Sequence, residues 1–260
     1  MFDLAPLSKE KYDLCRNTIS SNAFYLMVGD ALSCGMALSV VRMADGERHL
    51  LEEILSGIGD REWMESPVTG YDDAWMKRMG VYGITRRELH LRLIEAAKNC
   101  EFFAPSLSGI HKPEYEMHSF FPPRDRYVDN FFPNAWTDEM KINLYRKAGH
   151  VLFIHCNPNS AAALKLRLEN VLGVKVGYIQ MAKWQDAEGV VAEAAKNAAP
   201  LVIFSAGPAN KFIGPRIAHE GRTGKVTLDI GQASDRWLLE HLHKEAVAKK
   251  AQMEQTGIRR

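Results

Sequence analysis

Val151-Leu152-Phe153-Ile154-His155-Cys156 is the stretch of sequence that decides the fold. This run is apolar almost without interruption, which is typical of a β-strand that is buried on both faces of a sheet. Asn157-Pro158-Asn159-Ser160 ends the run, and residues 161–171 then show the periodicity of a helix that stops before Gly173. The stretch therefore predicts a buried strand followed by a helix.

The same alternation continues through the second half of the chain. Further strands are predicted at residues 175–181, 200–205 and 224–230, and further helices at 186–198, from about 209 to 219, and at 235–255. Strands that alternate with helices at this spacing form βαβ units, in which right-handed crossovers place helices on both faces of a parallel sheet. The sequence thus predicts an α/β fold with a mostly parallel sheet.

The first half of the chain is less regular. Helices are predicted at residues 9–32, 48–55 and 85–100, and strands at 36–41 and 102–107. The third helix has Thr85 as its N-cap and Glu88 three residues later, which is a capping box. Residues 108–134 are rich in proline, aromatic and charged residues, and we interpret them as an irregular insertion near the site. We expect one domain over residues 1–260.

Composition excludes several classes of protein. A net charge of +1 provides no overall basic field for nucleic acid, although a local basic patch remains open. The 4 cysteines include no CxxC pair, which argues against a zinc site and favours a reducing compartment. The N-terminal residues do not have the pattern of a signal peptide, and no apolar run is long enough to span a bilayer. The predicted location is cytoplasmic.

The segment Val40-Val41-Arg42-Met43-Ala44-Asp45-Gly46-Glu47 carries the strongest chemical signal. Asp45 and Glu47 follow a predicted strand, and the intervening Gly46 leaves room for both carboxylates to face one cation. Carboxylate pairs hold Mg²⁺ or Mn²⁺ and leave positions open for phosphate oxygens, and Arg42 suits bidentate recognition of phosphate. The alternative is a simple Asp-Gly turn in which Glu47 is the first acid of a helix.

A second candidate is the turn Ser205-Ala206-Gly207-Pro208-Ala209-Asn210-Lys211. Ser205 ends a predicted strand, small residues around Gly207 let a phosphate approach the start of the next helix, and Lys211 adds a positive charge. The turn has neither a GxxxxGK nor a GxGxxG motif. The alternative is an ordinary strand-to-helix connection with Pro208 at the first helical position.

Two further residues lie at predicted strand ends. Asp229 is followed by Ile230 and Gly231, so its carboxylate could orient a ribose or a phosphate-bound water, or could merely cap a loop. His155 is interpreted as a structural histidine. The aromatic and basic residues between 120 and 136 either pack the insertion onto the core or form a platform for a sugar or a base.

Three of these segments, in this order, resemble motifs of the GT-D-type glycosyltransferases, a family formerly classified as a domain of unknown function. Residues 40–47 are similar to the family's RFGDGE box, residues 205–211 to its GGPTAK turn, and residues 226–231 to its AIDIG strand end. The resemblance covers about residues 36–240. The chain departs from the family pattern at Met43-Ala44 and at Ala209-Asn210.

The resemblance implies a Rossmann-like sheet and the transfer of a hexose, typically glucose, from a UDP-sugar to a hydroxyl group. Asp45 and Glu47 match the DxE positions that engage the donor diphosphate through Mn²⁺ or Mg²⁺, and Arg42 matches the arginine of the box. The predicted catalytic and metal-binding residues are Asp45 and Glu47, with Asp229 as a further catalytic residue, and the predicted donor-binding residues are Arg42, Gly46, Ser205, Gly207 and Lys211.

Several alternatives remain open at this point. The acceptor is a glycan, a glycoprotein or a hydroxylated base in DNA, and its deprotonation falls to Asp229 or to an acid within residues 100–140. The same acids could instead serve a metal-dependent phosphohydrolase or nuclease, or the chain could be a nucleotide-binding module without turnover. Assembly into a homo-oligomer is also left open.

Overall fold

The computed structural model describes residues 17–43, 65, 83–105, 126–181, 183–220 and 224–256. Its centre is an eight-stranded sheet with the strand order β1-β4-β3-β2-β8-β7-β5-β6. The strands are β1 (Thr18–Ile19), β2 (Leu38–Arg42), β3 (Phe102–Ala104), β4 (Tyr127–Val128), β5 (His150–His155), β6 (Lys175–Gln180), β7 (Leu201–Ser205) and β8 (Val226–Asp229). Each strand pairs with its neighbours in parallel. The predicted α/β fold is confirmed.

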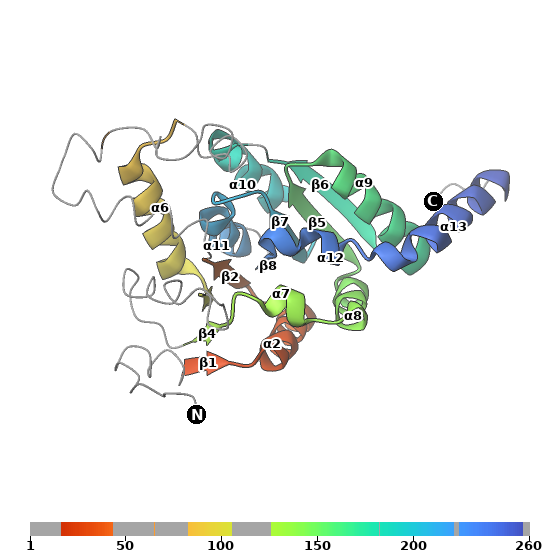
Figure 1. Cartoon of the computed structure of the whole chain (residues 1–260), viewed down its shortest axis with the longest axis horizontal. Helices are drawn as coiled ribbons and strands as arrows, with labels where there is room; N and C mark the ends of the chain where they lie inside the picture. Colours follow the sequence, from red (N-terminus) through yellow and green to blue (C-terminus); the bar gives the residue numbers. More distant parts are fainter. Residues whose placement is uncertain are drawn as a thin grey trace, which may run out of the picture.

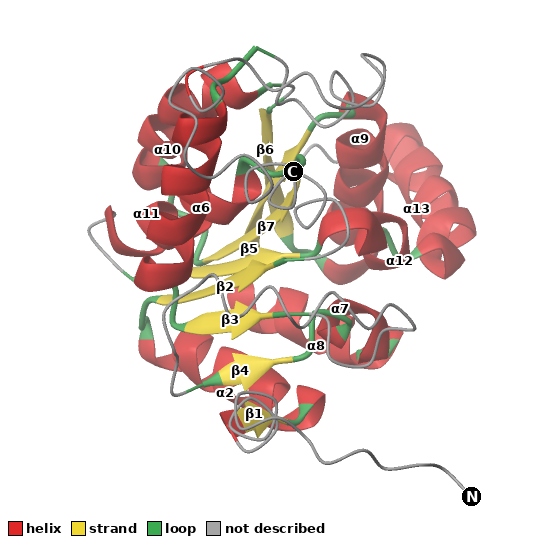
Figure 2. Ribbon diagram, turned by 60° about the vertical axis from the view of Figure 1, so that its left-hand side comes forward, coloured by secondary structure: helices red, strands yellow, loops and turns green. Residues whose placement is uncertain are grey.

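Helices cover both faces of the sheet (Figures 1 and 2). One face carries α6 (Arg86–Asn99), α10 (Ala187–Lys196) and α11 (Asn210–Glu220). The other carries α2 (Ser21–Cys34), α7 (Phe132–Ala135), α8 (Asp138–Ala148), α9 (Pro158–Arg167) and α12 (Ser234–Trp237). The last helix, α13 (His243–Thr256), contacts α9 and the short π-helix η2 (Leu168–Leu172) that follows α9. This arrangement is Rossmann-like.

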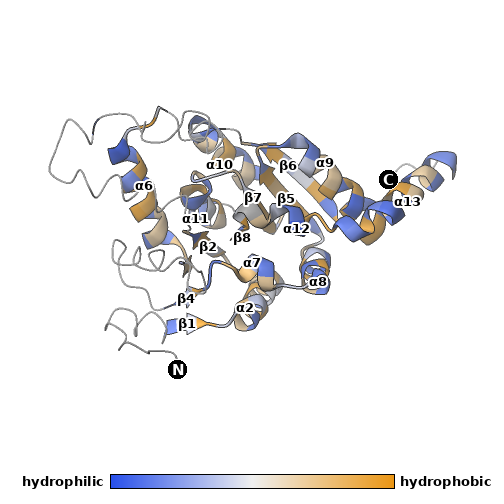
Figure 3. Cartoon of the chain, in the orientation of Figure 1, coloured by the Kyte–Doolittle hydropathy of each residue, from blue (hydrophilic) through white to orange (hydrophobic). Residues whose placement is uncertain are grey.

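Two apolar layers hold the sheet between these helices. Leu152 and Ile154 of β5 belong to the layer under α6, α10 and α11, whereas Val151 and Phe153 belong to the opposite layer. All four side chains are 0% exposed, because both faces of the strand are covered. This double burial explains why the strand is a continuous apolar run in the sequence. Figure 3 shows the apolar strands at the centre and polar residues on the outer sides of the helices.

The C-terminal helix differs from the prediction of one continuous helix over residues 235–255. The chain bends after α12 at Leu239, which has a positive φ of 51°, and passes through the short 3-10 helix η5 (Glu240–Leu242) before α13 begins. Side chains of α8 and α9 bind three successive carbonyls at the bend: Lys141 Nζ donates to Arg236 O (3.0 Å), Tyr145 Oη to Trp237 O (3.0 Å) and Arg167 Nη1 to Leu238 O (2.7 Å). In a continuous helix, backbone amides one turn later would donate to these carbonyls, and here the three side chains do so instead.

The first half also departs from the predictions in detail. Residues 18–19, expected to be helical, form β1, and α2 begins only after the N-cap Ser20. The described part of the 108–134 segment contains β4 and α7, so it contributes to the sheet and to its covering layer. The N-cap Thr85 is confirmed, since its side chain accepts from the Glu88 amide, while the Glu88 carboxylate accepts from Trp184 Nε1 (3.3 Å). The predicted helix at 48–55 lies outside the described residues.

Candidate functional site

Four strands bring their carboxyl ends together in the middle of the sheet: β2, β8, β7 and β5. In the register, His155 pairs with Ser205 and Phe204 pairs with Asp229, while Arg42 ends the neighbouring strand β2. The chain leaves β5 toward β6 on one side of this pair and leaves β7 toward β8 on the other side. In α/β sheets, ligands bind at the carboxyl edge where successive connections diverge in this way. The structure thus brings Arg42, Ser205 and Asp229 to one edge.

Asp229 forms a buried ion pair with Lys211 at this edge. The Lys211 Nζ atom lies 2.5 Å from Asp229 Oδ2, and the two side chains are 6% and 1% exposed. The other carboxylate oxygen, Oδ1, accepts a hydrogen bond from the Gly231 amide at 3.1 Å. Both carboxylate oxygens of the buried Asp229 are therefore engaged within the protein, one by Lys211 and one by the Gly231 turn. The catalytic role predicted for Asp229 stays a prediction.

Gly231 joins Arg42 to this network. Its φ is +48°, and a Cβ atom at this position would lie only 2.5 Å from Arg42 Nη1. The Arg42 guanidinium therefore packs directly on the glycine backbone, and the carbonyl of Gly231 accepts from Ser205 Oγ at 2.7 Å. Sequence reasoning named Gly231 only as part of a motif. Its function here is to leave room for the arginine.

Asn130 is a site residue that the sequence analysis missed. Its backbone carbonyl accepts from Arg42 Nε at 2.6 Å, its Nδ2 donates to Met43 O at 3.2 Å, and the residue is 1% exposed. Asn130 thus fixes the end of β2 to the segment that follows β4. An asparagine next to an aspartate indicates only a turn, so the sequence gave no indication that Asn130 contacts Arg42 and Met43.

The turn after β7 connects the strand to a helix as expected, but α11 begins at Asn210, so Pro208 lies before the helix and not at its first position. Gly207 has a φ of 76°, and its carbonyl accepts from the Asn210 amide (3.1 Å) as α11 begins. Asn210 is 2% exposed, and neither its Oδ1 nor its Nδ2 has a hydrogen-bond partner in the described part of the chain. The amides of Asn210 and Lys211 donate to carbonyls of this turn, so the start of α11 favours an anion at the carboxyl edge through the partial positive charge of the helix end.

His155 is 7% exposed, and burial lowers its pKa, although the nearby negative charge of Asp235 opposes this shift. Its Nδ1 accepts from the Asn157 amide at 2.8 Å, and its ring stacks on Phe153 with centroids 5.1 Å apart. A ring that accepts at Nδ1 and is neutral carries its proton on Nε2. The structural interpretation of His155 therefore fits, and the remaining N–H is a donor at the same edge.

Asp45, Gly46 and Glu47 lie outside the described residues, so the predicted metal site stays a prediction. Within the described ranges no group of three or more His, Cys, Asp or Glu side chains could hold a metal ion. No helix in the described part of the chain is long and apolar enough to cross a bilayer.

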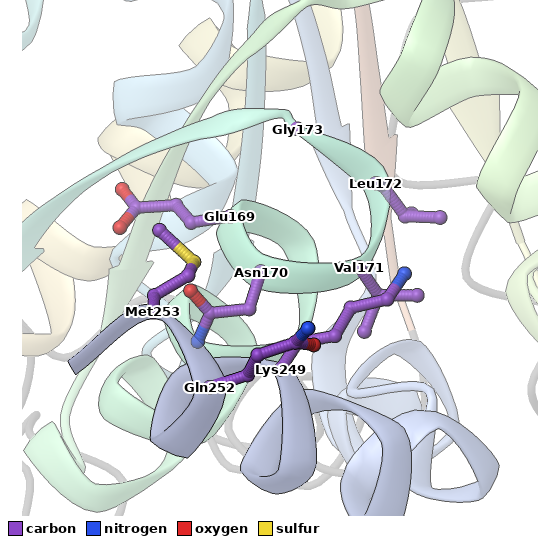
Figure 4. A pocket seen from close by; sticks show the side chains of 8 residues that line it. All are labelled: Glu169, Asn170, Val171, Leu172, Gly173, Lys249, Gln252 and Met253. Carbon is purple, nitrogen blue, oxygen red and sulfur yellow. The ribbon is translucent and has the colours of Figure 1, made fainter. Parts of the chain in front are cut away.

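A cavity of about 450 Å³ lies away from this edge, between η2 and α13 (Figure 4). Its lining includes Glu169, Lys249 and Met253. The π-helix η2 ends at Gly173, just before β6 starts, so this cavity lies toward the amino ends of the strands. It is therefore separate from the strand ends that carry the charged network.

A comparison with protein families identifies the second half. Residues 138–237 match the family model of the GT-D fold-like domain. This part of the chain is thus similar to the GT-D fold-like domain. The matched residues include Ser205, Gly207, Lys211 and Asp229, whereas Arg42, Asp45 and Glu47 precede them. The match confirms the resemblance to the GT-D family over residues 138–237, which include the segments at 205–211 and 226–231. No curated protein and no solved structure gives a significant match to the chain.

Proposed function

We propose that this protein is a metal-dependent glycosyltransferase that moves a hexose from a UDP-sugar to a hydroxyl acceptor. Glucose is the sugar that the family resemblance implies. One observation carries the proposal. Arg42, from outside the matched GT-D fold-like domain, packs on Gly231 within it, next to the Lys211–Asp229 pair at the carboxyl edge. An edge that combines a buried arginine with the partial positive charge of a helix start suits a nucleotide diphosphate.

The described residues support the donor side of the reaction. The start of α11 after Gly207 brings the partial positive charge of a helix N-terminus to this edge. The guanidinium of Arg42 lies at the same edge, where it is held by Asn130 and packs on Gly231. Donors that are fixed before the reaction stabilise the charge that develops on a leaving diphosphate. Lys211 shapes this edge through Asp229, because its charge is already paired there.

Asp45 and Glu47 would hold the metal ion. Their carboxylate oxygens fit Mn²⁺ or Mg²⁺, and the described residues offer no competing cluster of ligands. A bound divalent cation would supply Lewis-acid neutralisation of the diphosphate. Asp229, which is bound to Lys211 and Gly231, acts in this proposal by positioning, and the base that deprotonates the acceptor is left to other acids.

The experiment is a thermal-shift screen of nucleotide sugars with and without Mn²⁺, followed by an assay for released UDP. We expect UDP-glucose with Mn²⁺ to raise the melting temperature, and we expect Asp45→Asn to abolish metal-dependent turnover while the fold is kept. Asp30→Asn, on the exposed side of α2, is the matched control. Full activity of Asp45→Asn would contradict the proposal.

Two other outcomes distinguish the rival functions. Phosphate or nucleoside monophosphate released without a sugar would indicate a phosphohydrolase or nuclease, and stabilisation without turnover would indicate a binding module.

The salt dependence of acceptor binding distinguishes the possible acceptors. A steep loss of binding with rising salt favours a hydroxylated base in DNA, because phosphate contacts release counterions. A weak salt dependence favours a glycan or glycoprotein.

A further inference from the structure

Asn210 has a side chain that the free protein leaves unsatisfied. The residue is 2% exposed, and both Oδ1 and Nδ2 lack a hydrogen-bond partner in the described ranges. A buried donor or acceptor without a partner costs about 1–3 kcal/mol, so such groups are rare unless something else gains from them. Other described side chains with an unpartnered buried atom lie elsewhere in the fold, but Asn210 is the one among them in which two atoms lack a partner.

The position of Asn210 places this amide at the site. Gly214, one helical turn later, faces the sheet, since a Cβ there would meet the Phe204 ring at 3.4 Å and Thr227 Oγ1 at 3.6 Å. Residues i and i+4 of a helix share a face, so Asn210 also faces the sheet, at the helix end nearest the strand carboxyl ends. The next residue, Lys211, reaches Asp229 at the end of β8.

We propose that Asn210 is a specificity residue that binds a neutral group of the donor nucleotide sugar. The side-chain amide of Asn210 has two N–H donors and one oxygen acceptor, and none of them has a partner. A ligand group that both accepts and donates a hydrogen bond would satisfy both atoms. The uracil imide edge and a hexose hydroxyl both have this chemistry, whereas a phosphate only accepts. The diphosphate is attracted to Arg42 and the helix start instead. Because the amide is buried, the turn at residues 206–209 opens locally as this group enters.

This inference rests on the proposed function, and Asn210→Leu tests it. Leucine has a similar size and no polar atoms, so removing the unsatisfied amide should leave the melting temperature of the free protein unchanged or higher. Affinity for UDP-glucose with Mn²⁺, measured by calorimetry, should fall about tenfold or more. Asn134→Leu, on the exposed side of α7, is the control and should bind like the wild type. If leucine does not fit, Asn210→Ala is measured in the same way.

The ligands distinguish the two sources of the neutral group. If Asn210 reads uracil, the variant loses affinity for UDP and no longer distinguishes UDP from CDP. If it reads the hexose, UDP binds unchanged and UDP-glucose binds only as tightly as UDP. Wild-type affinity of both Asn210 variants for UDP-glucose would overturn the inference and leave the proposed function intact. A wild-type protein that binds no nucleotide sugar would overturn both.

Discussion

Lys225 and Lys211 are both almost completely buried, with exposures of 2% and 5%, but they lie at opposite edges of the sheet. Lys225 precedes β8 at the amino edge, and its Nζ donates to the carbonyls of Asn197 and, at 3.0 Å, of Ala199. Lys211 reaches the carboxyl edge, where its Nζ lies 2.5 Å from Asp229 Oδ2. Burial lowers the pKa of Lys225, whose partners are neutral carbonyls, whereas Lys211 faces a carboxylate.

The two edges differ in the same way beyond these lysines. At the amino edge, Glu101 Oε2 accepts from both the amide and the hydroxyl of Ser39, and Glu101 Oε1 lies 2.7 Å from His219 Nε2. The half-buried His150, whose Nε2 has no partner in the described residues, is an exception there. At the carboxyl edge, Asn130 and Asn210 keep unsatisfied amide atoms. The carboxyl edge therefore combines paired side chains, such as Lys211 and Asp229, with two asparagine amides that keep unpartnered atoms.

The largest expected effect comes from Lys211→Met. It leaves the Asp229 carboxylate buried without its cation, and breaking a buried pair in this way costs about 3–5 kcal/mol of unfolding free energy. The matched variant Lys225→Met removes hydrogen bonds to two carbonyls and leaves no buried charge, so it should cost about 1–3 kcal/mol. Urea unfolding measures both values. Equal losses would remove the contrast between the edges.

Gly231→Ala should lower the unfolding free energy less than Lys211→Met does, and its main effect should be on the binding of the nucleotide sugar. The strained φ costs about 1–2 kcal/mol, and the new methyl group displaces the Arg42 guanidinium, which can move because it ends a flexible side chain. We expect the response to UDP-glucose with Mn²⁺ to be lost. At the amino edge, Gly224→Ala would meet the backbone nitrogen of Ala37 at 2.2 Å, so it should cost stability instead, about 3 kcal/mol.

Gly189→Ala is the control for both glycine variants. A Cβ at Gly189 meets nothing within 4 Å in the interior of α10, so this variant should be stabilised by about 1 kcal/mol and bind normally. Normal nucleotide-sugar binding by Gly231→Ala would show that the position of Arg42 on the glycine is not needed for the site.

Sequence reasoning succeeded where local pattern and burial agree. The run at 151–156 corresponds to β5 because both faces of that strand are covered, and the helix before Gly173 ends at a glycine with a φ of 70°. Reasoning failed where distant side chains decide the backbone. The bend at Leu239 depends on donors from α8 and α9, which no window around residue 239 contains.

The site shows the same division. The order of strand ends placed Ser205 and Asp229 at one edge, since carboxyl ends of parallel strands share an edge. The partners of those residues were not predictable, because the Lys211–Asp229 pair and the Arg42–Asn130 hydrogen bond join positions 18 and 88 residues apart. A pairing over such distances depends on the packing of α11 and on the segment after β4, and neither leaves a periodic signal.

The smallest expected effect is a change in pH dependence from His155→Gln. Burial holds the pKa of His155 below its ordinary value, so the unfolded chain binds a proton more readily than the folded protein. The stability contributed by this residue is present above its unfolded pKa of about 6.5 and is lost as the pH falls through the folded pKa.

The wild-type protein should therefore lose unfolding free energy between pH 7 and pH 5, and His155→Gln should lose less over the same range. Glutamine can still accept the Asn157 hydrogen bond, which limits structural loss. The same substitution at the exposed His243 is the matched control, and urea unfolding at each pH is the measurement. His90 and His150, whose pKa values burial also lowers, keep part of the slope in every variant. If the pH dependence of the unfolding free energy is the same in His155→Gln as in the wild type, His155 is hydrated in the folded protein. That result would contradict the burial of His155 beside Ser205.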